Sequence, residues 1–273
     1  MKKTIYIVTE GFKLKAKRKR FTVTIGKQTV EWAAVNLNSI IIAAKEGTIS
    51  TRAILLSYTS QTPIITIDTE KQTITPLPQK PGNIENTIQQ YTHLEQIDKE
   101  TLRKARIKNI NRLLKTLKHP EIYPDENIEE AENKLLNHVE KDKKGFKQAY
   151  RQLQLLLQAE ATAALQGKGI DLTLGLNRRK TNLPLALDYA DIYTEPTVTL
   201  TALQTATTTH NMEAQAALKI LAKKLDKNMT RKTGLTTIRE MIYRQSQAFT
   251  SYLTNPKLKI NPPIWPIKWS NYT

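Results

Sequence analysis

The chain has 273 residues, no cysteine, and a formal net charge of +17 at pH 7. Its length allows a sizeable buried core and favours two domains, and the lack of cysteine excludes disulfides and thiolate metal sites. The N-terminal sequence MKKTIYIVTEGFK holds an apolar run too short for a signal peptide, and no later run is long enough to cross a membrane. We therefore expect a soluble cytoplasmic protein, and its positive charge favours a polyanion as partner.

Residues 1–80 carry the pattern of a β-rich domain. Runs rich in β-branched residues, separated by Gly, Lys or Asn, predict strands at TIYIV, FTVTI, SIIIAA and PIITID. Ser50 and Thr51 precede apolar residues at helical spacing, which predicts a capped helix packed on the sheet. The proline-rich segment TPLPQKPGN, residues 75–83, is predicted to be an interdomain linker.

From residue 84 onward the pattern is helical, so we expect an α+β fold with a larger all-α domain over residues 81–273. Residues 100–118 place apolar side chains near every 3.6 positions, with Lys and Arg on the other side. An acidic helix follows from Ile128. Further helices are predicted over 146–166, where Glu160 is expected to be structural, and over 197–206, 211–227 and 235–253.

Positive charge is clustered along the chain, which favours a nucleic-acid partner over the alternative of a merely basic soluble protein. Residues 13–20 form one dense basic run, and Lys or Arg recur along the helix predicted at 100–118. The tail NPPIWPIKWSNYT cannot continue a helix, and either docks in a partner groove or folds back on its own domain.

The most informative segment is GIDLTLGLNRRKTNLPLALDYADIY, residues 169–193. Asp188 and Asp191 lie three residues apart at the start of a predicted helix, so they share one face and can converge on a cation. The basic run Arg178, Arg179 and Lys180 lies ten residues upstream of Asp188. Carboxylates that hold a metal beside basic groups that hold phosphate are what chemistry on a phosphodiester needs.

This segment resembles the active-site region of the CRISPR spacer-acquisition integrase family. The family's pattern is roughly G-hydrophobic-D-P-x-hydrophobic-G-x-x-H, a gap, and then hydrophobic-x-D-x-x-[DE]. The residues that match are Gly169, Ile170, Asp171, Gly175, Asp188 and Asp191. Earlier matches in the family's order are Tyr6, Gly11, Leu14, Ser50, Thr51, Ala53, Ile54, Ala105, Arg106, Asn109, Leu113 and Leu114. The resemblance therefore extends from the first strand to at least residue 200.

The resemblance implies a catalytic and metal-binding set with one departure. Asp188 and Asp191 match two metal ligands, and Glu129 is the nearest positional match for the family's glutamate ligand, with Glu132 second; either could instead be a solvated acid near a helix start. The family's catalytic histidine is Arg178 here, and a guanidinium has no lone pair for a metal. We predict that Arg178 replaces the metal by pairing with Asp188 or Asp191, which keeps phosphate affinity and loses hydrolysis.

Three functions are compatible with these observations. The first is a catalytically impaired member of the family that keeps its fold and its grip on DNA; the second is an active endonuclease and integrase that uses Mg²⁺ or Mn²⁺; the third is an unrelated basic helical nucleic-acid binder. The resemblance also implies a homodimer through the β-rich domain and association with the family's small ferredoxin-like partner. The residues predicted to contact DNA are Lys17, Arg18, Arg20, Arg106, Arg178, Arg179 and Lys180.

Overall fold

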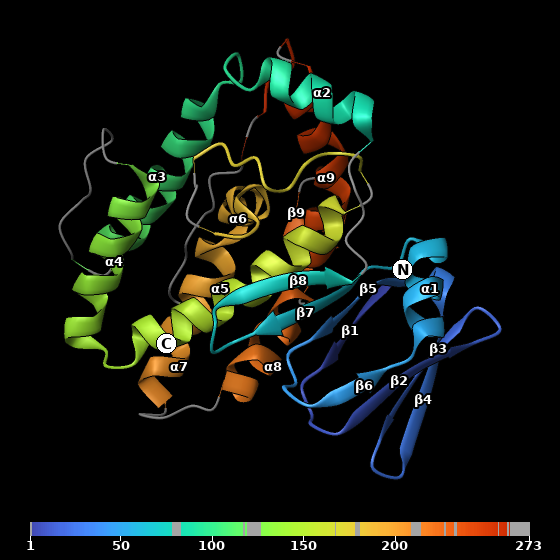
Figure 1. The fold of residues 1–273 in the computed structure, drawn as a ribbon. Coiled ribbons are helices and arrows are strands. Elements are labelled where there is room, and N and C mark those ends of the chain that lie inside the picture. Colours follow the sequence, from blue (N-terminus) through green and yellow to red (C-terminus); the bar gives the residue numbers. More distant parts are fainter. Residues whose placement is uncertain are drawn as a thin grey trace.

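The computed structural model describes residues 2–77, 83–116, 118, 127–166, 168–177, 181–208, 214–226, 228–231, 234–255, 257–260 and 262. A β-rich part comes first and a larger helical part follows, which confirms the predicted α+β fold (Figure 1). In this described part of the chain, no helix combines the length and the hydrophobicity that a membrane span requires.

Two four-stranded sheets make up the β-rich part. The first has the order β1-β5-β7-β8, in which β1, β5 and β7 are parallel and β8 is antiparallel to β7. Its strands are β1 (Lys3–Ile7), β5 (Leu37–Ile42), β7 (Ile64–Asp68) and β8 (Thr73–Leu77). The second has the order β4-β3-β2-β6. Its strands are β2 (Phe12–Lys17), β3 (Arg20–Ile25), β4 (Gln28–Ala33) and β6 (Gly47–Ile49).

The basic run at residues 13–20 forms a β-hairpin of β2 and β3, as the family resemblance implies. Along β2 the side chains alternate, so that Phe12 and Leu14 are buried while Lys13, Lys15 and Lys17 are exposed. Arg18 and Lys19 have φ angles of 49° and 61° and link β2 to β3. A two-residue turn with positive φ at both positions matches the twist of the strands, so the hairpin carries its charges toward solvent.

The predicted capped helix is confirmed as α1 (Thr51–Ser60), whose N-cap residue Ser50 accepts a hydrogen bond from the Ala53 backbone N–H at 3.3 Å. The linker predicted at residues 75–83 is partly wrong. Its first residues belong to β8, where Pro76 is paired with Ile65. Proline is tolerated there because β8 is an edge strand, on which one side needs no backbone donor. Residues 78–82 lie outside the described part of the chain.

The helical part is built around α5 (Phe146–Leu165), which is buried over most of its length. The other helices are α2 (Ile84–His93), α3 (Lys99–Thr116), α4 (Ile128–Asp142), α6 (Pro184–Ala190), α7 (Leu200–Thr208), α8 (Ala214–Leu225) and α9 (Ile238–Thr254). A one-turn 3-10 helix (Asp191–Tyr193) and a π-helical turn (Glu195–Thr199) join α6 to α7.

The expectation of an all-α second domain is wrong in one place. A two-stranded antiparallel hairpin, β9 (Asn228–Arg231) and β10 (Gly234–Thr237), lies between α8 and α9. The helix predicted from residue 235 therefore begins at Ile238. Thr237 is its N-cap and forms a capping box with Glu240, which satisfies backbone N–H groups that the first helical turn leaves unpaired.

The first sheet packs on helices with one face and on the second sheet with the other. Ile41 and Ile65 belong to a core shared with α5 and its neighbouring helices. Ile40 and Ile64, one residue before each, belong to a second core with Phe12 and other residues of the second sheet. Successive side chains of a strand point to opposite faces, so β5 and β7 serve both cores.

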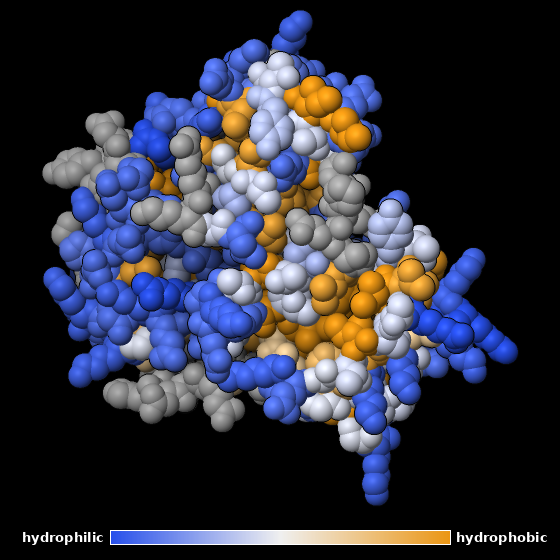
Figure 2. Space-filling view, in the orientation of Figure 1, coloured by the Kyte–Doolittle hydropathy of each residue, from blue (hydrophilic) through white to orange (hydrophobic). Residues whose placement is uncertain are grey.

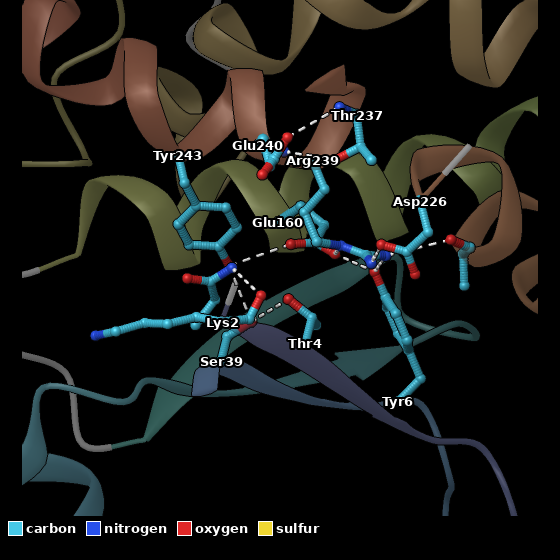
Figure 3. A network of polar contacts seen from close by, with 12 residues as sticks. Lys2, Thr4, Tyr6, Ser39, Glu160, Asp226, Thr237, Arg239, Glu240 and Tyr243 are labelled. Carbon is cyan, nitrogen blue, oxygen red and sulfur yellow. Dashed lines mark hydrogen bonds and ion pairs between the residues drawn. The ribbon is translucent and has the colours of Figure 1, made fainter. Parts of the chain in front are cut away.

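A buried polar network joins the β-rich part to the helices (Figure 3). The Glu160 carboxylate of α5 accepts hydrogen bonds from Arg239 Nε at 2.9 Å, from the Tyr243 hydroxyl at 3.1 Å and from the Tyr6 hydroxyl of β1. Tyr243 also lies 2.9 Å from the hydroxyl of Ser39 in β5. Burial, and then the Glu160 charge, raise the pKa of Tyr6 and Tyr243. Glu160 thus has the structural role predicted for it.

Candidate active site

Asp188 and Asp191 lie at the centre of the helical part. Asp188 is on α6, which begins with Pro184 at its first position, where a missing N–H costs nothing. Asp191 follows at the start of the 3-10 turn, and the two residues are only 3% and 4% exposed. Both residues line one cavity.

Asp188 organises the turn that follows Gly175. Its Oδ2 accepts hydrogen bonds from the backbone N–H groups of Leu176 at 2.5 Å and Asn177 at 3.2 Å. The turn after Gly175 is therefore held by Asp188, the carboxylate that the family resemblance assigns to a metal. At least part of the role of Asp188 is to hold this loop.

The Gly-x-Asp part of the motif packs on α2. Gly169 has a φ of +77°, and a Cβ there would lie 2.7 Å from the Asn83 Cβ. Asp171 is held by a reciprocal pair with Gln90, whose amide accepts the Asp171 N–H at 2.8 Å and donates to its carbonyl at 3.0 Å. Glycine is thus required by backbone conformation and by the close approach of α2.

Arg106 is not a DNA contact, contrary to the prediction. The residue is 3% exposed, and its Nη1 lies 2.6 Å from Glu195 Oε1. The same guanidinium lies 3.9 Å from Asp191 Oδ1 and donates to the Asp191 carbonyl at 3.2 Å and to the Tyr150 hydroxyl at 3.0 Å. The periodicity of α3 turns this one basic residue inward, between Leu102, Ala105 and Asn109, which line the same cavity.

A glutamate of α4 joins this cluster through a tyrosine. Glu132, which is 6% exposed, accepts a hydrogen bond from the Tyr150 hydroxyl at 2.6 Å and from Gln154 Nε2 at 2.7 Å. Tyr150 in turn accepts from Arg106. Glu129, the nearest positional match for the family's glutamate, lies nearly one turn earlier and is half-buried. Glu132, the second match for the family's glutamate, is therefore linked to Arg106 through Tyr150.

The charges of this cluster act on one another because all are removed from water. Burial by itself lowers the pKa of Arg106, but the carboxylates of Glu195, Asp191 and Glu132 together with Tyr150 raise it overall. Burial raises the pKa of Glu195 to about 7, although Arg106 opposes that shift. Buried acids outnumber the one guanidinium, and a raised carboxyl pKa is the expected response.

Sequence reasoning missed Glu195 and the inward orientation of Arg106. Glu195 follows Asp191 by four residues, which is the spacing that puts two side chains on one helical face, so an acidic stripe was detectable. Its partner was not detectable from spacing, because Arg106 is on a different helix.

The arrangement does not fit the divalent cation that the resemblance implies. Asp191 faces a guanidinium, Asp188 binds backbone amides, and the cavity that they line has a volume of about 10 Å³, room for about one water molecule. No cluster of three or more His, Asp or Glu suited to a metal ion occurs among the described residues. A fixed positive charge also repels a second cation.

Three of the predicted site residues, Arg178, Arg179 and Lys180, lie outside the described residues. The predicted DNA contacts on the β2–β3 hairpin are described but do not line this cavity. Lys17, Arg18 and Arg20 are exposed in the β2–β3 hairpin, and Arg20 pairs with Glu31 at 3.0 Å. Their sheet lies on the opposite side of the molecule from α3 and α4 (Figure 1).

The outer face of α3 is basic even though Arg106 points inward. Lys104, Lys108, Arg112 and Lys115 are exposed and recur at spacings of three or four residues, so they share one face of the helix. Hydrophilic side chains cover the surface over α3 and α4 in Figure 2, whereas hydrophobic side chains gather near α1 and over α2.

A β-rich part followed by a helical part gives this chain the fold of solved casposase and Cas1 structures. A casposase bound to integration product has a TM-score of 0.72 at 15% identity, over 97% of this chain and 95% of that one. A Cas1 protein from Thermotoga maritima has a TM-score of 0.66 at 13% identity, over 94% and 98%. A TtCas1–DNA complex has a TM-score of 0.60 at 12% identity, over 96% and 94%.

The sequence pattern of the family described as CRISPR associated protein Cas1 matches residues 5–166, more than half of the chain. The chain belongs to the Cas1 family, which confirms the resemblance seen in its sequence. No curated protein sequence matches it. The third function considered above, an unrelated helical binder, is thereby excluded.

Proposed function

We propose that this Cas1-family protein binds DNA in the manner of an integrase and that its metal-dependent nuclease and strand-transfer activity is impaired or absent. The observation that carries the proposal is Arg178, which stands at the position of the family's catalytic histidine and has no lone pair for a metal. The buried Arg106 guanidinium, 2.6 Å from Glu195 and 3.9 Å from Asp191, adds a positive charge beside the acids.

DNA binding is supported by the net charge of +17, by the basic outer face of α3, and by the likeness to structures that are described with DNA or an integration product. The predicted contacts Lys17, Arg18 and Arg20 are exposed. The basic run Arg178, Arg179 and Lys180 belongs to this proposal as well. A cytoplasmic location remains part of the proposal.

An active endonuclease and integrase is the second candidate. It is favoured by Asp188 and Asp191 lining one cavity, and Glu129 or Glu132 of α4 would be its glutamate ligand. Mg²⁺ or Mn²⁺ would be the cofactor in that case.

A homodimer through the β-rich part belongs to the same proposal. Val35, Leu55 and Tyr58 are large apolar residues that are 66%, 59% and 53% exposed in this part of the chain. Exposed apolar patches are typical of surfaces that bind another protein. Light scattering of the full chain measures its mass, and a monomer at all concentrations would contradict the dimer. The small ferredoxin-like partner can be added in the same experiment.

The proposed function is tested with a forked DNA duplex in the presence of Mn²⁺. Wild type is expected to bind the duplex with an affinity that falls as salt rises, and to leave it neither nicked nor joined. Arg178→His tests the histidine position, and Asp191→Ala is the control for metal-dependent cutting. Cutting by wild type that is lost in Asp191→Ala would establish the active candidate, and an affinity independent of salt would contradict phosphate binding.

A further inference from the structure

We infer that the chain after α9 forms a strap over the cavity of Asp188 and Asp191, and that a DNA strand must displace this strap to reach the two acids. The strap is the described chain at residues 257–260 together with Pro262. This inference deepens the proposed function and rests on it, because it names what controls access to the same site. The sequence left open whether the tail from Asn261 docks on a partner or folds back on its own domain.

A turn redirects the chain where α9 ends. The Asn255 side chain accepts the Lys257 backbone N–H at 3.1 Å, and the Asn255 carbonyl accepts the Leu258 N–H at 3.1 Å. An asparagine that binds the backbone two residues further on mimics a turn and competes with the helix. His93 of α2 has its Nδ1 2.8 Å from the carbonyl oxygen of Thr254, a group that the end of a helix leaves without a partner. The chain therefore leaves α9 next to α2.

One apolar residue fastens the strap to the helical part. Ile260 is partly buried and packs against the core formed by α3, α5 and α6, whereas residues 257–259 are exposed. The strap belongs to no helix or strand of the described chain. A segment with few buried apolar contacts and no regular hydrogen bonding opens at a lower free-energy cost than a packed helix.

Pro262 brings the strap to the acids. It is half-buried and lines their cavity. The volume of this cavity is about 10 Å³, room for about one water molecule, so no phosphodiester fits while every wall is in place. The other walls come from α3, the start of α4, the loop after Gly175 and the α6 turn, with the lining residues Leu102, Ala105, Arg106, Asn109, Ile128, Asn177, Asp188, Asp191 and Ile192.

Among the described walls of the cavity, the strap has the weakest hold. Movement of α3, α4 or α6 would expose buried core, and Arg106 also ties α3 to Glu195 at 2.6 Å. The loop after Gly175 is held by the two backbone N–H groups that Asp188 binds. The strap depends on the apolar side chain of Ile260. It is therefore the wall that a DNA strand can move at the lowest cost.

The charge of the strap suits displacement by DNA. Lys257 and Lys259 are exposed, and Lys268 is the one charged side chain from Asn261 to Thr273. With no acidic side chain, this segment does not imitate the phosphate backbone, so it excludes DNA by its volume. Contacts of its lysines with phosphate would offset the cost of lifting it.

The cover is tested without DNA, by the reactivity of a cysteine in the cavity. The chain has no cysteine of its own, so Ala105→Cys places a single thiol on the cavity wall, where Ala105 is 8% exposed. In the full-length protein this thiol should react slowly with a maleimide, and in the chain that ends at Ile260 it should react roughly tenfold faster or more. Ala53→Cys, buried in α1, is the control for general loosening and should react equally slowly at both lengths.

The displacement is tested on Pro262→Cys in the full-length protein with a forked DNA duplex. DNA that lifts the strap should raise the maleimide labelling rate of this cysteine by about threefold or more, whereas DNA that binds on top of the strap would lower it. Lys71→Cys, in the exposed turn between β7 and β8, is the control and should label at the same rate with and without DNA.

Two results would overturn the inference. One is an Ala105→Cys labelling rate that the truncation leaves unchanged, or that rises no more than the rate of Ala53→Cys. The other is a Pro262→Cys labelling rate that bound DNA leaves unchanged or lowers. If Ala105→Cys does not fold, Leu102→Cys on the same wall takes its place with the same outcomes. If the chain binds no DNA, the proposed function and displacement by DNA both fail, while the labelling of Ala105→Cys still decides whether the strap covers the cavity.

Discussion

At the scale of single residues, the motif glycine and the buried arginine have roles that their chemistry explains. Arg106 is one basic residue among several on α3, yet it faces inward and meets the acids, while Lys104, Lys108 and Lys115 face solvent. Gly169 is required because its φ of +77° and the nearby Asn83 exclude a side chain. Gly169 and Arg106 both match the family pattern, and each has a structural role in this fold.

Gly169→Ala is expected to destabilise the protein by more than the roughly 1 kcal/mol that positive φ alone costs. The added Cβ would lie 2.7 Å from the Asn83 Cβ and 3.2 Å from its backbone nitrogen, so α2 must shift. Gly145→Ala is the matched control, since Gly145 has a φ of +84° and no heavy atom within 4 Å of the added Cβ. Urea unfolding of both variants measures the difference, and equal losses would show that the contact with α2 carries no cost.

At the scale of elements, a capping box sets the start of α9, and helix periodicity sets which side chains of α3 are exposed. The hydroxyl of Thr237 caps the Glu240 N–H at 3.1 Å, and Glu240 Oε2 accepts the Thr237 N–H at 3.1 Å. A hydrogen bond from the backbone of Thr237, and then one from the Thr236 hydroxyl, lower the pKa of Glu240 below its usual 4.5. The start of α9 is therefore sensitive to acid.

Glu240→Gln tests this sensitivity. A carboxyl group whose pKa is lower in the folded state stabilises the fold above its unfolded pKa, and the stabilisation is lost as the pH falls through the folded value. The stability difference between wild type and Glu240→Gln should accordingly be fully present at pH 6 and shrink progressively as the pH falls below about 4.5. Thr237→Ala, which removes the cap without removing the acid, should cost about 1 kcal/mol. A difference between wild type and Glu240→Gln that is constant with pH would contradict the charged cap.

The exposed face of α3 is expected to contact the DNA backbone. Lys108→Ala and Lys115→Ala should each weaken binding and reduce the slope of log affinity against log salt by about one unit. Lys71→Ala, in the exposed turn between β7 and β8, is the control because it lies outside every predicted DNA contact. Fluorescence anisotropy at several salt concentrations measures the slopes. If the salt dependence of the affinity has the same slope in all three variants as in wild type, the exposed face of α3 does not contact DNA.

At the scale of the whole molecule, the network around Glu160 joins strands from the start of the chain to α9 near its end (Figure 3). The Arg239 guanidinium pairs with both Glu160 and Asp226 and lies 5.2 Å from the centre of the Tyr6 ring. A core that continues from the first sheet into the helices reinforces this connection. The domain boundary predicted near residue 80 stays a prediction. A shared core and the Glu160 network both join residues on either side of it.

Arg239→Met is expected to destabilise the protein by about 3 kcal/mol or more, because it leaves the Glu160 carboxylate buried without its counterion. Adding Glu160→Gln should recover part of the loss, because a neutral amide costs less to bury than an unpaired charge. Denaturant unfolding of the single and double variants measures the coupling between the two residues. Additive effects of the two substitutions would show that the pair does not stabilise the junction.

Local patterns in the sequence determined the order of a β-rich and a helical part, the Ser50 cap, and the shared face of Asp188 and Asp191. Each of these depends on residues within a few positions of one another, where the periods of strand and helix act. In β2 the charged and apolar residues alternate with the period of a strand, although the lysines also form a charge run.

Only the tertiary structure decided which cation meets the acids. Arg106 reaches the carbonyl of Asp191 across 85 positions of sequence, and Glu160 pairs with Arg239 across 79. Helix periodicity places a side chain on a face, but the packing of α3 against the α6 turn decides whether that face meets solvent or buried carboxylates. The family and its fold could be recognised from local matches, whereas the state of the candidate site depends on contacts between distant elements.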